Sequence, residues 1–83
     1  MTTVYVLLHC KAGSEKSIID EISKIPDVVE VRGTYGMHDI FVKVRSKDIK
    51  TMNKVVTLAI RRIPNIISTN TLLAIEQQGG KEE

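Results

Sequence analysis

The segment spanning residues 34–39 combines residue types that could bind a small molecule carrying both charges. Gly36 can adopt a positive φ and leave backbone N–H groups directed outwards, as small anion-binding loops do. Asp39 offers a carboxylate for an ammonium group, so the pair would suit a free amino acid. The alternative is that Gly36 is a hairpin glycine and Asp39 a solvated turn residue. The candidate ligand-binding residues of this segment are Tyr35, Gly36, Met37, His38 and Asp39.

A second polar group follows near the C-terminus, in the segment Ser68–Thr71. Four small hydrogen-bonding side chains in one strand can line a pocket, and we take Thr69 and Thr71 as further ligand-binding candidates. The alternative is an ordinary edge strand, in which serine and threonine are common.

Catalytic chemistry has little support in this sequence. His9 and His38 are the general-base candidates near neutral pH, and nothing places either beside Cys10 or a serine. No phosphate-binding or dinucleotide-binding fingerprint occurs. Two histidines and one cysteine are too few for an ordinary structural zinc site. We therefore expect no catalytic residue, no metal and no cofactor.

An internal repeat organises the elements that must position these residues. The pentapeptide at 25–29, Ile-Pro-Asp-Val-Val, recurs 38 residues later as Ile-Pro-Asn-Ile-Ile. Apolar positions agree across most of both halves, and each half has the pattern of a strand, a helix and a strand. The predicted strands cover residues 3–10, 28–35, 38–45 and 66–76.

Capping residues and prolines mark the two predicted helices. Ser14 can cap the first, and Pro26 ends it. Ser46 or Asp48 caps the second, and Pro64 ends it. The residues expected to face the core are Ile18, Ile19, Ile22 and Ile25 in the first helix, and Ile49, Met52, Val56, Ala59, Ile60 and Ile63 in the second.

The order βαββαβ predicts an α+β, ferredoxin-like domain with a four-stranded antiparallel sheet and two helices on one face. The domain should span residues 1–77, and residues 78–83 should form a flexible tail. The second face of the sheet then lacks cover. Because such a small core benefits from oligomerisation, we expect a symmetric dimer joined sheet to sheet. Its expected interface residues are Tyr5, Leu7, His9 and Phe41.

The bulk composition indicates a cytoplasmic protein without a nucleic-acid site of its own. The 83 residues carry a formal charge of +2, from 12 basic and 10 acidic side chains, which is too balanced for a nucleic-acid-binding chain. No run of residues is long and apolar enough for a membrane span, and the N-terminus has no leader pattern.

The turn and its flanks resemble a known family signature. The stretch 36–44, Gly-Met-His-Asp-Ile-Phe-Val-Lys-Val, is similar to the Gly-x-x-Asp-apolar-x-apolar-x-apolar pattern of the effector domain in Lrp/AsnC transcription regulators. That domain is the RAM module, for regulation of amino-acid metabolism. The segments Val28–Val31 and Thr69–Thr71 also fit, and the resemblance covers roughly residues 2 to 77.

The resemblance implies a regulatory module and no enzyme. It implies sheet-to-sheet dimers that assemble into an octamer or decamer, with effector amino acids held between dimers near the turn. By motif match, Tyr35, Gly36 and Asp39 carry over. Family regulators have an N-terminal helix-turn-helix domain, whereas this chain begins at the first strand of the module. We therefore expect no direct DNA binding, and co-assembly with a full-length Lrp/AsnC-type regulator as one possible role.

Two other functions remain open on the sequence. Dimeric α/β-barrel enzymes, such as small monooxygenases and isomerases, share this topology, since fold does not fix function. They would need a polar cavity between the sheet and the helices. A purely structural interaction module, which needs no ligand, is the third interpretation.

Overall fold

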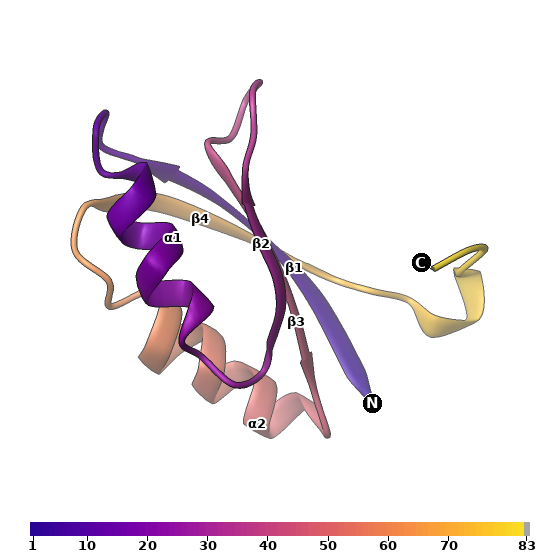
Figure 1. Cartoon of the computed structure of the whole chain (residues 1–83). Coiled ribbons are helices and arrows are strands. Elements are labelled where there is room, and N and C mark those ends of the chain that lie inside the picture. Colours follow the sequence, from indigo (N-terminus) through magenta and orange to yellow (C-terminus); the bar gives the residue numbers. More distant parts are fainter. Residues whose placement is uncertain (83) are drawn as a thin grey trace.

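The computed structural model describes residues 1–82 and confirms the predicted ferredoxin-like topology (Figure 1). The strands are β1 (Thr2–Cys10), β2 (Val28–Gly33), β3 (Ile40–Ser46) and β4 (Ile66–Leu73). The helices are α1 (Glu15–Ser23), α2 (Ile49–Lys54), the π-helix η1 (Val55–Ile60), which continues α2, and the short 3₁₀-helix η2 (Glu76–Gln78).

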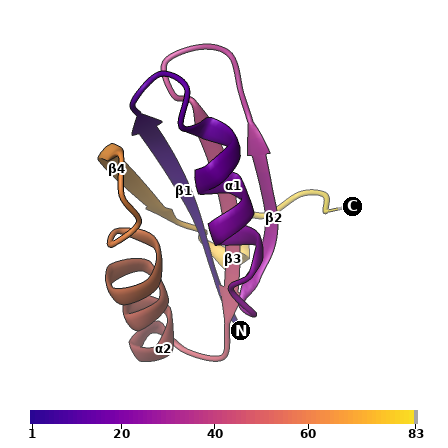
Figure 2. The ribbon, with the colours of Figure 1, turned by 60° about the vertical axis from the view of Figure 1, so that its left-hand side comes forward.

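The four strands form one antiparallel sheet in the order β2-β3-β1-β4. The two halves of the repeat meet at its centre, where Val4 pairs with Val44 and Val6 pairs with Val42. Figure 2 shows α1 and α2 side by side on the same face of this sheet. Neither of them covers the opposite face, as the sequence predicted, but the segment that contains η2 returns over one end of that face, which the sequence did not predict.

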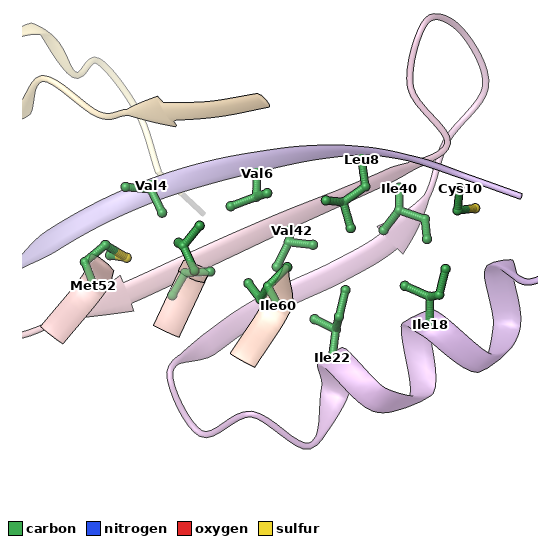
Figure 3. Close-up of a cluster of buried hydrophobic side chains, with 12 residues drawn as sticks. Val4, Val6, Leu8, Cys10, Ile18, Ile22, Ile40, Val42, Met52 and Ile60 are labelled. Atoms are coloured by element: carbon green, nitrogen blue, oxygen red, sulfur yellow. The ribbon is translucent and has the colours of Figure 1, made fainter. Parts of the chain in front are cut away.

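A core of apolar side chains fills the space between the sheet and the helices. Figure 3 shows Ile18 and Ile22 of α1 directed towards Ile40 and Val42 of β3. The buried core residues are Val4, Val6, Leu8, Cys10, Ile18, Ile22, Ile40, Val42, Val44, Met52, Val56 and Ile60. The strand residues among them alternate along β1 and β3, so each strand directs every second side chain to the helices. These apolar residues fill the space where a barrel enzyme would need a polar cavity.

The first helix lacks its predicted side-chain cap, whereas the second is capped by one of its two predicted residues. Ser14 stands at the N-cap of α1, but its side chain makes no capping bond and donates to the carbonyl of Lys11 instead. Asp48 caps α2 by accepting the Thr51 N–H at 2.7 Å, and this bond holds the pKa of Asp48 below its usual range. Ser46 takes no part in capping, because its hydroxyl donates to Asp27 Oδ2 at 2.6 Å.

The second helix departs from regular α geometry after Lys54. In η1 the backbone hydrogen bonds join residues five positions apart instead of four. The last of them runs from the Arg61 N–H to the Val56 carbonyl at 3.0 Å. The inner face still contains Met52, Val56 and Ile60. Ile49, expected to face inwards, is 56% exposed, because it lies in the first turn after the cap, where the helix has only begun to approach the sheet.

Beyond β4 the chain turns to the face without helices. In Figure 2 the C-terminal segment passes behind β3 and β2, on the side opposite to α1. β4 ends at Leu73, three residues before the predicted end of that strand. The expected flexible tail covers residues 78–83, of which Glu83 lies outside the described residues, and its flexibility stays a prediction.

Truncation of Ile22 tests the core. Ile22 has no exposed surface and contacts the sheet from α1, so Ile22→Ala should lower the free energy of unfolding by about 2–5 kcal/mol. The measurement is chemical denaturation at fixed protein concentration. Leu58→Ala is the matched control: Leu58 is 51% exposed, and its truncation should change stability by less than about 1 kcal/mol. Equal losses in both variants would contradict this placement of the core.

Candidate ligand-binding site

The connection between β2 and β3 is a closed loop held by its own hydrogen bonds. The Thr34 N–H donates to the Asp39 carbonyl at 2.9 Å, and the Thr34 hydroxyl donates to the His38 carbonyl at 2.8 Å. Gly36 at the tip has φ +125°, a conformation that residues with a Cβ rarely adopt. Because of these bonds, β2 ends at Gly33, before its predicted end at residue 35, and β3 begins at Ile40, after its predicted start at residue 38.

Asp39 fastens this loop to the end of β1 through both its backbone and its side chain. Its N–H donates to the Leu8 carbonyl at 2.8 Å, and its Oδ2 accepts the Cys10 N–H at 3.0 Å. The side chain keeps 39% of its surface exposed. Asp39 is therefore more than a solvated turn residue, and its carboxylate can still meet a ligand from the solvent side.

A pocket of about 340 Å³ lies between the loop and the start of α1, and its lining residues are Glu15, Gly33, Thr34, Tyr35 and Asp39. Two of the predicted ligand-binding residues, Tyr35 and Asp39, therefore share one pocket. Glu15 adds a second carboxylate, which was not among the ligand-binding residues predicted from the sequence. Its Oε1 accepts the Gly13 N–H at 2.9 Å, which holds the side chain beside the loop.

The thiol of Cys10 reports the charge of this region. Burial raises the pKa of Cys10 above its ordinary value, a hydrogen bond with Ser14 opposes the rise, and the negative charges of Glu15 and Asp39 add to it. The thiol of Cys10 and the carboxylates of Glu15 and Asp39 therefore interact electrostatically, although they come from three different parts of the chain.

On the other side of the loop, two histidines connect the turn to the sheet face without helices. The His9 and His38 rings stack with centroids 4.7 Å apart. Asn70 Nδ2 lies 3.0 Å from His38 Nε2, and His9 Nδ1 lies 3.7 Å from Asp39 Oδ2. Within residues 1–82, no group of three or more His, Cys, Asp and Glu is placed to hold a metal ion.

The remaining predicted ligand-binding residues do not all gather at the turn. Tyr35 and Met37 are almost fully exposed at the loop tip. Thr69 and Thr71 pair with Leu8 and Val6 on β1, so their side chains lie on the helix-facing side of β4 and are separated from β3 by β1. The residue of β4 that does reach the turn is Asn70, which alternation places on the opposite side.

The expected interface residues lie on the sheet face opposite to α1 and α2, and their role in an interface stays a prediction. Tyr5 and Phe41 stack across β1 and β3 with ring centroids 5.9 Å apart. Leu7 pairs with Phe41 in the same ladder, and His9 lies beyond it near the turn. We call this surface the open face. Its members on the two central strands are Thr3, Tyr5, Leu7, His9, Phe41, Lys43 and Arg45.

Comparison with known proteins assigns the family. The family model of the Lrp/AsnC ligand binding domain matches residues 3–79. The chain belongs to this family. The family is regulatory, not enzymatic, which argues against the barrel-enzyme alternative. No helix among residues 1–82 is long and apolar enough to cross a membrane.

Individual relatives support the assignment. The HTH-type transcriptional regulator FL11 of Pyrococcus horikoshii is 32% identical over 72 residues, which is 87% of this chain and 47% of FL11. The chain thus spans about half the length of the curated relatives that it matches. The crystal structure of FFRP-DM1 is 33% identical with a TM-score of 0.86, covering 90% of this chain and 100% of that one.

A more distant structure shares the fold alone. The transcriptional regulator NMB0573 from Neisseria meningitidis, solved as a complex with L-Met, is 9% identical with a TM-score of 0.82. The similarity covers 95% of this chain and 53% of that one.

The charge at the pocket can be measured through Cys10. Because the carboxylates of Glu15 and Asp39 raise the pKa of the thiol, Glu15→Gln and Asp39→Asn should each lower it. More thiolate then forms at pH 8, and native-state alkylation by iodoacetamide should become faster. Asp39→Asn keeps an oxygen that can accept the Cys10 N–H. Asp20→Asn, on an exposed position of α1, should leave the rate unchanged. If the alkylation rate of Cys10 were the same in both pocket variants as in the wild type, the two carboxylates would lie too far from Cys10 to change its pKa.

Proposed function

We propose that this chain is the effector-binding and oligomerisation module of a transcription regulator, and that it binds a free amino acid at the turn between β2 and β3. Gene regulation takes place where the DNA is, so the proposal places the protein in the cytoplasm. The chain's balanced charge, +2 in total, favours DNA contact through a partner, such as a full-length Lrp/AsnC-type regulator.

The observation that carries the proposal is the pocket shared by Asp39, Glu15 and the loop. Two carboxylates beside an open space can receive an ammonium group. A carboxylate needs donors. Among residues 1–82, the N–H groups of Tyr35, Gly36 and Met37 donate to no protein acceptor, so they remain available for one. An α-amino acid presents the two complementary charges on one carbon atom.

The pocket of one chain supplies only part of the surroundings that an amino acid needs. Tyr35 is fully exposed at its rim, where a neighbouring subunit could cover a ligand. Met37, His38, Thr69 and Thr71 stay in the proposal as candidates for contacts made across such a junction. The family resemblance favours dimers that assemble into an octamer or decamer, with the ligand held between dimers.

Ligand binding is expected to stabilise the folded protein. One amino acid of the standard twenty should raise the melting temperature by on the order of 10 °C at a hundredfold excess over its Kd, which corresponds to about 2.7 kcal/mol. Asp39→Asn should abolish this shift, because it removes the charge opposite the ammonium group and keeps the acceptor for Cys10. Gly36→Ala should weaken it by straining the loop at φ +125°.

The control for this screen is Asp20→Asn, which should shift with ligand as the wild type does. If no amino acid moves the wild-type transition, amino-acid sensing is wrong. If one does and Asp39→Asn responds equally, a ligand binds at a different place.

Self-association is expected to bury the open face. Phe41→Glu should raise the dimer dissociation constant by more than about a hundredfold, because an unpaired charge buried there costs several kcal/mol. Phe41→Leu should associate nearly as the wild type does. Light scattering over a dilution series measures both. A wild type that stays monomeric at micromolar concentration, or a Phe41→Glu variant that assembles normally, would contradict the proposed interface.

A further inference from the structure

The end of the open face opposite to the turn is basic. Lys43 and Arg45 project from β3, where the register aligns them with Tyr5 and Thr3 of β1. Arg45 Nε donates to the Thr3 hydroxyl at 3.2 Å. The Lys43 side chain keeps 13% of its surface exposed and that of Arg45 30%, so both cations are largely covered. Cations withdrawn from water need a counter-ion nearby.

The C-terminal segment supplies this counter-ion. Glu82 Oε2 lies 2.6 Å from Lys43 Nζ and also contacts the guanidinium of Arg45. These two bonds, that of Lys43 first, hold the pKa of Glu82 below its usual range. The contact joins residues 39 positions apart and brings the segment from η2 to Glu82 back over the sheet (Figure 2). A cavity of about 470 Å³ lies between the segment and the strands, lined by Thr3, Tyr5, Lys43 and Arg45 on the sheet side.

The remaining charges on the sheet edge do not neutralise this pair. On β2, Glu30 is engaged by Arg32, whose Nε lies 2.7 Å from Glu30 Oε2. Within residues 1–82, Glu82 is thus the carboxylate that forms ion pairs with Lys43 and Arg45. In a symmetric pairing of two open faces, both copies would contribute Lys43 and Arg45 to the interface. The repulsion between these cations would grow as water left the interface.

We propose that Glu82 is the counter-ion that allows the open face to pair with a second copy of this chain, which makes the C-terminal segment part of the self-association surface. The inference rests on the self-association in the proposed function and adds a residue that the family signature does not contain. The segment lies at the Thr3–Arg45 end of the face. The cavity beneath it reaches Tyr5, so Phe41 and Leu7, towards the other end, remain for the apolar contact.

The experiment compares dissociation constants by sedimentation velocity over a dilution series at low salt. Glu82→Gln should raise the dissociation constant on the order of tenfold. The ion pair also exists in the free chain, so the effect comes from the interface, where Lys43 and Arg45 of both faces would be buried without their counter-ion. At 500 mM NaCl, where the Debye length falls to about 4 Å, the difference from the wild type should shrink. The matched control is Glu76→Gln: Glu76 belongs to the same segment and forms no ion pair with a described residue.

Charge exchange separates electrostatics from any change in the backbone of the segment. Glu82→Lys should weaken association more than Glu82→Gln does, and combining it with Lys43→Glu should restore part of the loss. Unchanged association of Glu82→Gln in an associating wild type would overturn this inference alone. Tighter association of that variant would overturn it too, since the segment would then compete with the second copy. A monomeric wild type would overturn the proposed self-association and this inference together, without touching amino-acid binding.

Discussion

The helices α1 and α2 pack on the same side of the four-stranded sheet, and this one-sided cover decides what the rest of the chain must do. Every second residue of β1 and β3 enters the core, so the intervening residues must point to the other side. There the chain places an aromatic pair, Tyr5 and Phe41, between a histidine cluster at one end and a basic pair at the other. In a single chain the C-terminal segment covers the basic end of this surface and the rest of it faces water.

Asp39 holds the turn on β1 and also belongs to the proposed ligand site. The carboxylate that would attract a ligand's ammonium group also accepts the Cys10 N–H and lies beside His9. A ligand that draws on this charge therefore acts on the end of β1 as well. Since His9 belongs to the open face and stacks on His38 of the turn, the proposed ligand site and the proposed interface are in direct contact through side chains.

The charges of the chain are arranged in local pairs across long sequence distances. Asp39 lies beside His9 at one end of the open face, and Glu82 meets Lys43 and Arg45 at the other. The chain as a whole is nearly neutral, but its charges are unevenly distributed. An acidic pocket lies beside the turn, and a basic strand end lies under the C-terminal segment. In an assembly of identical chains, such an arrangement of charges can fix how the chains are oriented relative to one another as well as attract them.

The sequence by itself determined the order of elements, the outward-facing residues of β1 and β3, and the prolines that follow each helix, because alternation, helical periodicity and proline act over a few residues. Tertiary structure alone decided that Glu15 joins Asp39 at a pocket, that Asn70 rather than Thr69 reaches the turn, and that Glu82 returns to Lys43. These contacts depend on strand order and register. A local pattern carries no information about which distant strands become neighbours or where a free segment comes to rest.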